Sequence, residues 1–97
     1  NADIHPQEDG SYLIDGGTHI REINRALSWD LPTHGPKTLY GLILEHLEMI
    51  PAPGTSLLIA NYPIEITRSE NNAVQTARIQ PRLPAAKDTA DREREMD

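Results

Sequence analysis

Four histidines are the residues of this chain best suited by type to bind a metal ion or to transfer a proton. They are His5, His19, His34 and His46, and no two have the spacing that places a pair of ligands on adjacent turns of one helix. His46 has a leucine four residues before it and an isoleucine four residues after it, so we expect its ring to hydrogen-bond a main-chain or tyrosine group. The histidines therefore predict no transition-metal site.

Acidic residues near the N-terminus are the candidate oxygen ligands for a hard cation. Asp15 begins an Asp-Gly-Gly segment, and Glu8 and Asp9 precede it by a few residues. A calcium loop supplies several oxygens at alternating positions, and this stretch has too few of them. We expect the Asp15 side chain to accept N–H bonds in a turn, and we assign no metal ligand.

The segment from Gly35 to Thr38 (GPKT) has a superficial likeness to the end of a phosphate-binding loop. The loop pattern G-x-x-x-x-G-K-[ST] needs a glycine directly before the lysine, and this chain has Pro36 there. Proline also lacks the N–H group with which such a loop holds phosphate. The sequence therefore predicts no nucleotide site formed by this loop.

No group of residues suited to covalent or acid–base catalysis stands out. The absence of Cys excludes thiol nucleophiles, thiolate metal sites and disulfides. Glu45 and Glu48 are three residues apart and fit the solvated edge of a helix. We predict that the chain is not an enzyme, with no catalytic residues and no bound cofactor.

Charge and hydrophobicity exclude two further classes. Nine Lys and Arg against fifteen Asp and Glu give a net charge of −6, and the basic residues are scattered, so we predict no nucleic-acid binding. The longest run of only Leu, Ile and Ala covers residues 57–60, whereas a membrane-spanning helix needs roughly 20 mostly apolar residues. We expect no membrane insertion by this segment.

Two polar ends enclose a predicted domain at residues 10–83. Residues 1–9 are interpreted as a linker or tag remnant, and residues 84–97 as a charged, disordered tail. Inside these limits the pattern predicts a strand at 11–14 and a turn at 15–17. Thr18 is the predicted cap of a helix whose apolar residues, Ile20, Ile23 and Leu27, recur at helical spacing.

A second, very apolar helix is predicted at 39–50, with Thr38 as its cap and Pro51 as its end. Its wide apolar surface predicts a central position, packed on the first helix and on a sheet. Three strands then follow, at 56–60, 64–67 and 74–79, with a bend at 61–63 and a hairpin turn at 71–72.

A β-bulge near Gln75 or Thr76 is expected, because it restores the apolar phase of the last strand. The element order predicts an α+β fold, β-α-α-β-β-β, with an antiparallel sheet. The open edge strands of the closing meander are the predicted contact surface.

The order and spacing of four short segments resemble one known family. They are DGSYLIDG at 9–16, IREIN at 20–24, TLYGLIL at 38–44 and MIPAPG at 49–54. With the closing three-strand run they resemble the CorC/HlyC transporter-associated domain over roughly residues 9 to 83. The fold of that family is similar to a subdomain of the para-cresol-methylhydroxylase-type FAD-binding fold.

The resemblance implies a regulatory role in transport of divalent cations. It implies a cytosolic domain at the C-terminus of a bacterial inner-membrane protein, with a transmembrane domain and CBS domains of the same chain as partners. Such parents are described as magnesium and cobalt efflux proteins or as hemolysins. A homodimer is a further expectation. Two alternatives stay open: an FAD- or nucleotide-binding domain, and a direct divalent-cation sensor that uses Asp9 and Asp15.

The positions that match the family are expected to be structural. Gly16 should permit the strand-to-helix turn, Asn24 should tie the first helix to the following loop, and Gly41 should allow close helix packing. The full set is Asp15, Gly16, Asn24, Thr38, Gly41, Pro51 and Gly54. The residue before Gly41 is commonly small in the family and is Tyr40 here, which disfavours FAD.

Overall fold

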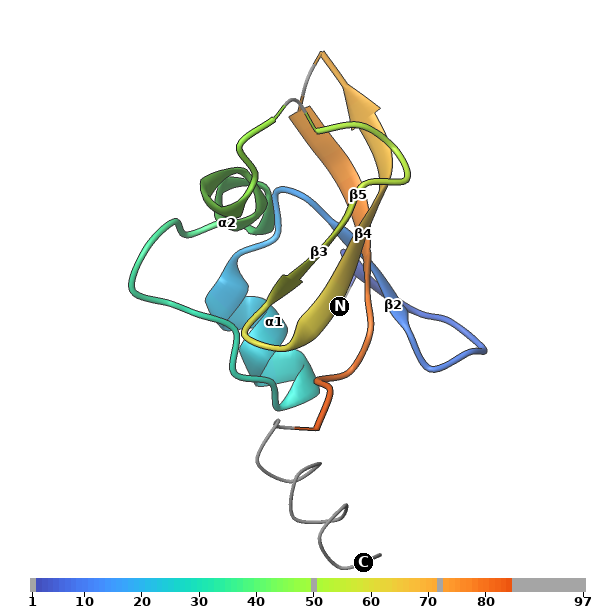
Figure 1. The fold of residues 1–97 in the computed structure, drawn as a ribbon. Coiled ribbons are helices and arrows are strands. Elements are labelled where there is room, and N and C mark those ends of the chain that lie inside the picture. The colour runs from blue at the N-terminus through green and yellow to red at the C-terminus, as the bar shows by residue number, and fades with distance from the viewer. Residues whose placement is uncertain (1, 50, 72, 85–97) are drawn as a thin grey trace, which may run out of the picture.

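The computed structural model describes residues 2–49, 51–71 and 73–84, which form two helices on a five-stranded sheet (Figure 1). In chain order the elements are β1 (Ile4–Pro6), β2 (Tyr12–Asp15), α1 (Ile20–Leu27), α2 (Leu39–His46), β3 (Ser56–Ile59), β4 (Tyr62–Glu70) and β5 (Ala73–Ile79). The strand order is β1-β2-β5-β4-β3, and every neighbouring pair is antiparallel. The predicted α+β class with an antiparallel sheet is confirmed.

The core lies between the helices and one face of the sheet. Ile14, Ala77 and Ile66 are direct neighbours on β2, β5 and β4, and none of the three is exposed to solvent. Both helices lie on the same side of the sheet, and each adds a fully buried isoleucine, Ile23 from α1 and Ile43 from α2 (Figure 1). Alternate strand positions are buried because successive side chains point to opposite faces of a strand.

The interpretation of residues 1–9 as a linker is wrong for residues 4–6. These form β1, an edge strand in which Ile4 pairs with Ile14 and is buried. The strand has three residues and ends in Pro6, so it is too short and too polar to show an alternating pattern. The predicted disordered tail at residues 84–97 lies, apart from residue 84, outside the described residues.

Thr18 does not cap α1. The N-cap is His19, whose side chain makes no capping bond, and the N–H of Ile20 instead donates to the carbonyl of Lys37 at 2.8 Å. The N–H of Leu39 donates back to the carbonyl of Thr18 at 3.0 Å. Residues 18–20 and 37–39 therefore form a short two-stranded contact that satisfies the helix start with main-chain groups, which a local capping signal does not reveal.

The second helix is capped as predicted and is shorter than predicted. Thr38 Oγ1 accepts a hydrogen bond from the N–H of Gly41 at 3.2 Å. The helix ends at His46, and Leu47 already has an extended backbone. Pro51 has no N–H to continue a helix and would clash with the carbonyl four residues earlier, so the chain leaves the helix before it reaches the proline.

The β3–β4 hairpin turns earlier than predicted. Ala60 and Asn61 have φ values of 50° and 69°, as a tight two-residue hairpin turn requires, while Tyr62 and Pro63 already belong to β4. The bulge predicted near Gln75 is present, because Arg68 pairs with Thr76 and Ser69 with Val74, which leaves residue 75 unpaired in that ladder. A second irregularity, at residue 67 on β4, was not predicted.

Candidate functional site

Gly16 lies where β2, β5 and α2 meet. Its N–H donates to the carbonyl of Gln75 at 2.9 Å, and its own carbonyl accepts from the N–H of Tyr40 at 2.8 Å. A methyl group at Gly16 would come within 2.1 Å of the carbonyl oxygen of Val74. Glycine is therefore needed here for close main-chain approach; a positive φ is not involved.

Gly41 also sits in a tight contact, and the partner is the loop before α2. An added methyl group at Gly41 would lie 2.9 Å from Cβ of Pro36. The close packing expected at Gly41 is thus made against a loop residue, because the glycine lets Pro36 approach the first turn of α2. The same contact fills the space at Gly41, and Tyr40 beside it packs against the core, so these residues do not fit a cofactor such as FAD at this position.

Asn24 fixes the chain that follows α1. Its side-chain amide donates to the carbonyl of Leu31 at 3.0 Å, and its Oδ1 accepts from the N–H of Leu31 at 2.9 Å. Leu31 itself is 1% exposed. The tie between helix and loop expected for Asn24 is thus made by a pair of hydrogen bonds to one buried residue.

The remaining motif residues have local roles. The main-chain carbonyl of Asp15 accepts a hydrogen bond from the N–H of Thr18 at 3.1 Å. The turn therefore uses the carbonyl of Asp15 and not its carboxylate, which differs from the expectation. Gly54 has φ +90° and donates to the carbonyl of Ile66 at 2.7 Å, which fixes the loop that leads into β3. Pro51 is buried in the same loop.

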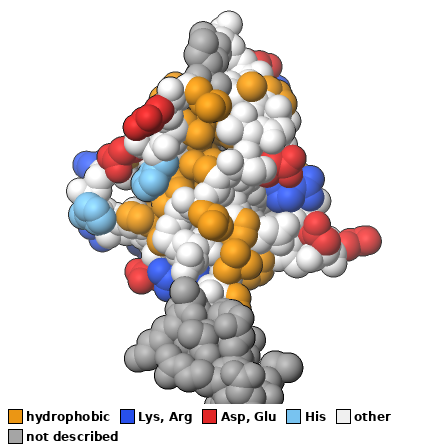
Figure 2. Space-filling model, viewed as in Figure 1, with side chains coloured by type: hydrophobic (Ala, Val, Ile, Leu, Met, Phe, Trp, Pro, Cys, Tyr) orange, Lys and Arg blue, Asp and Glu red, His pale blue; other side chains and the backbone are white. Residues whose placement is uncertain are grey.

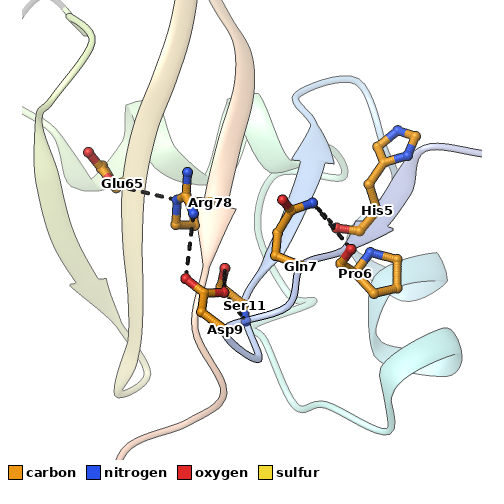
Figure 3. A network of polar contacts seen from close by, with 7 residues as sticks. All are labelled: His5, Pro6, Gln7, Asp9, Ser11, Glu65 and Arg78. Carbon is orange, nitrogen blue, oxygen red and sulfur yellow. Dashed lines mark hydrogen bonds and ion pairs between the residues drawn. The ribbon is translucent and has the colours of Figure 1, made fainter.

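Asp9 lies in the turn before β2 and Asp15 at the far end of that strand, so they are not placed to share one cation. Asp9 is already engaged: Oδ1 accepts from the N–H and hydroxyl of Ser11 at 2.9 and 2.6 Å, and Oδ2 lies 3.7 Å from Arg78 (Figure 3). Arg78 also lies 3.7 Å from Glu65 across the outer face of the sheet. Among the described residues, no three His, Asp or Glu side chains are placed to hold a metal ion together.

The Ser11 hydroxyl lowers the pKa of Asp9 below its ordinary value of 3.8, helped by the main-chain N–H of Ser11 and by the charge of Arg78. A lowered folded-state pKa contributes stability above the unfolded-state pKa, and this stability is lost as the pH falls through the folded-state pKa. We expect Ser11→Ala to raise the Asp9 pKa toward 3.8 and to weaken the dependence of stability on pH below about pH 4. A carbon-detected NMR titration of Asp9 measures the shift, with Ser56→Ala on β3 as the control, and an unmoved Asp9 midpoint would contradict this reading.

His46 behaves as the sequence predicted, with Nδ1 3.0 Å from the carbonyl oxygen of Leu42, four residues earlier. It lies exposed at the end of α2. This bond occupies one ring nitrogen with a helix-end carbonyl, so the ring helps to end the helix.

A groove lies on the outer face of the sheet, over β3 and the neighbouring parts of β4 and β5, and Glu65 and Arg78 are among its lining residues. Its volume is about 560 Å³, and its lining includes Leu57, Leu58 and Pro63. Leu58 is 56% exposed, and Leu83 is 45% exposed. The N–H of Leu83 donates to the carbonyl of Asn61, which holds Leu83 beside the β3–β4 hairpin. We call Leu58, Leu83 and this groove the β3 edge patch. Other hydrophobic side chains gather over β3 and the adjacent side of α2 (Figure 2).

A second pocket lies between the start of α1 and the α1–α2 loop. It has a volume of about 440 Å³. Four of the residues that line it have basic side chains: His19, Arg21, His34 and Lys37. The sequence does not indicate this site, since Arg21 and Lys37 are sixteen positions apart and the basic residues are scattered along the chain.

Neither described helix is long and apolar enough to cross a membrane. The chain matches the family model CorC_HlyC, described as a transporter associated domain, over residues 5–83. It is 39% identical over 89 residues to the UPF0053 inner membrane protein YfjD of Escherichia coli strain K12, which covers 92% of this chain and 21% of that protein. It is 31% identical over 97 residues to the polyamine export protein of the same strain, covering 88% of this chain and 22% of that protein.

Among solved structures, the chain is similar to a functionally unknown conserved protein from Haemophilus influenzae Rd KW20. The TM-score is 0.77 and the identity 39%, over 82% of this chain and 98% of that chain. That crystallised chain therefore contains little beyond the matched region, which indicates that the fold forms without further domains. The present chain spans about a fifth of the length of the curated relatives that it matches.

Proposed function

Because this chain belongs to the CorC_HlyC transporter-associated domain family, we propose that it is a non-catalytic regulatory domain of an inner-membrane cation transporter, on its cytoplasmic side. The relation to an inner membrane protein supports the location. The motif positions support the absence of catalysis, since Gly16, Asn24, Thr38 and Gly41 are all used in main-chain contacts that hold the fold together. The domain then acts by contact with its neighbours.

The β3 edge patch is the proposed contact surface, and the CBS domains of the same transporter are the proposed occupant. β3 pairs with β4 on one side and is an edge of the sheet on the other, so its outer main-chain groups are available for a partner. Exposed Leu58 and Leu83 add apolar area beside this edge. The relatives are about five times longer than the matched region, so such a domain has neighbouring parts of its own chain to contact.

The proposed cargo is a divalent cation such as Mg²⁺ or Co²⁺, as the family resemblance implies. A polyamine is the second candidate, because one relative at 31% identity is a polyamine export protein. Both are cations, so a single regulatory contact of this domain serves either cargo. The two are separated by measuring export of Mg²⁺, Co²⁺ and a polyamine such as spermidine from the same cells.

The test uses the full-length transporter with three changes. Deletion of residues 10–83 should alter export or its dependence on cation concentration. Leu58→Glu should reproduce part of that effect, because it places a charge in the proposed contact while the exposed site leaves folding intact. His5→Glu, on the opposite edge strand β1, is the matched control and should behave as the parent.

Unchanged export of all three cations after the deletion would overturn the regulatory role. A Leu58→Glu transporter indistinguishable from the His5→Glu control would overturn the β3 edge patch as the contact. The expected homodimer is a separate outcome: if the isolated domain is a dimer by light scattering and Leu58→Glu makes it a monomer, a second copy and not the CBS domains occupies the patch.

A further inference from the structure

The pocket between α1 and the α1–α2 loop is basic on an acidic molecule. The chain has a net charge of −6, yet His19, Arg21, His34 and Lys37 all line this one pocket. Figure 2 shows His and Lys or Arg side chains on the side of the molecule that carries this loop, with acidic side chains beside them. No acidic residue is among those that line the pocket, whose other members are Ile20, Thr33, Gly35 and Pro36.

The frame of the pocket is fixed by main-chain hydrogen bonds. The N–H of Ile20 donates to the carbonyl of Lys37 at 2.8 Å, and His19 and Thr38 form an antiparallel bridge. These contacts hold the start of α1 against the end of the loop, so Arg21 and Lys37 stay close although they are distant in sequence. A fixed frame reduces the ordering cost that a ligand would have to offset.

The two permanent charges of the pocket are not neutralised within the described part of the chain. Arg68, Arg78 and Arg82 each form an ion pair with a carboxylate, whereas Arg21 and Lys37 form none with any described residue. Unneutralised positive charge in a concave site raises the local concentration of anions. The positive charge of the pocket therefore favours an anionic ligand.

We propose that this pocket binds a phosphate group. A phosphate dianion accepts hydrogen bonds from several directions, and the pocket offers the forked guanidinium of Arg21, the ammonium of Lys37, two imidazoles and the Thr33 hydroxyl. Pro36 supplies no N–H, so binding here rests on side chains and differs from that of a phosphate-binding loop. A volume of about 440 Å³ accommodates a phosphate with a small organic group attached.

One carboxylate limits the affinity of the pocket. Oε2 of Glu45 on α2 lies next to Gly35, 3.2 Å from the position that a methyl group on that glycine would occupy. Its negative charge opposes an anion bound in the neighbouring pocket, which Gly35 helps to line. Removal of this charge is therefore expected to strengthen binding, a result that general loss of structure cannot produce.

The ligand has two sources with the same chemistry: a soluble phosphate ester and the phosphate of a lipid headgroup. We expect glycerol 3-phosphate and pyrophosphate to shift the amide NMR signals of residues 19–21 and 33–37 in the ¹⁵N-labelled chain at constant ionic strength. Sedimentation with phosphatidylglycerol vesicles, compared with phosphatidylcholine vesicles, tests the lipid source. Binding of the soluble esters without vesicle binding assigns a free ligand, and vesicle binding without binding of the esters assigns a headgroup.

Single substitutions separate this site from general charge attraction. Arg21→Ala and Lys37→Ala should each weaken binding roughly threefold to tenfold, and Glu45→Gln should tighten it by a few fold. Arg25→Ala removes the same charge from the same helix outside the pocket and should leave binding unchanged. Equal weakening by all three basic variants, or no saturable binding to any of the probes, would overturn the proposal.

Discussion

Replacement of Gly16 by alanine is expected to destabilise the domain by about 3 kcal/mol or more. The new methyl group would lie 2.1 Å from the carbonyl oxygen of Val74 and 3.1 Å from its carbonyl carbon. These are main-chain atoms in β5, so no side-chain rotation relieves the contact. Gly16 cannot withdraw either, because hydrogen bonds to Gln75 and from Tyr40 hold it from two sides.

Urea unfolding of the 97-residue chain followed by circular dichroism measures this effect. Gly17→Ala is the matched control, because a methyl group at the next position meets no atom within 4 Å. The free energy of unfolding of that control should lie within about 0.5 kcal/mol of the parent value. For a domain of this size, 3 kcal/mol corresponds to a fall in melting temperature of roughly 12 °C or more. Equal stabilities for the two alanine variants would show that β5 can move away from Gly16 at little cost.

Gly16 also shows where inference from sequence reached its limit. The motif identified the residue, and local reasoning attributed it to the freedom of a turn. The structure attributes it to Val74, which is 58 positions away in the chain. A sequence signal for turns is local, whereas this requirement arises only once β5 has been laid beside β2. The importance of the position could be predicted, and its physical cause could not.

The difference between local signals and long-range contacts also explains which elements were predicted correctly. The Thr38 cap, the turn at Asn71, which has a φ of 52°, and the bulge at residue 75 depend on residues a few positions apart, and each is present. β1 exists only because β2 offers it an edge. Similarly, the start of α1 is satisfied by residues 37–39, so Thr18 was a plausible local cap that tertiary contacts replaced.

The basic pocket also depends on contacts between residues that are distant in the sequence. Its four basic residues come from two segments that are brought together by main-chain bonds between residues 18–20 and 37–39. Counted along the sequence, Arg21 and Lys37 are isolated charges on an acidic chain. Net charge still argues against nucleic-acid binding, because that needs a wide basic surface. It does not exclude a single phosphate in one pocket.

The tie between α1 and the α1–α2 loop is the second place where one side chain has a large expected effect. Asn24→Ala should cost about 2 to 3 kcal/mol, because it leaves both the N–H and the carbonyl of buried Leu31 without their partner. Asn24→Asp keeps the acceptor for the Leu31 N–H and loses the donor to its carbonyl. The free energy of unfolding of Asn24→Asp should therefore lie between those of the parent and the alanine variant.

Urea unfolding of the three chains gives the ranking, and amide hydrogen exchange gives the location of the loss. The N–H of Leu31 should lose protection in Asn24→Ala and keep part of it in Asn24→Asp, because only the aspartate still accepts its hydrogen bond. Asp30, whose N–H donates to the Tyr62 hydroxyl at 2.8 Å, is the internal reference for the same loop. If Leu31 stays protected in the alanine variant, the loop is held by the burial of Leu31 itself, and Asn24 contributes little.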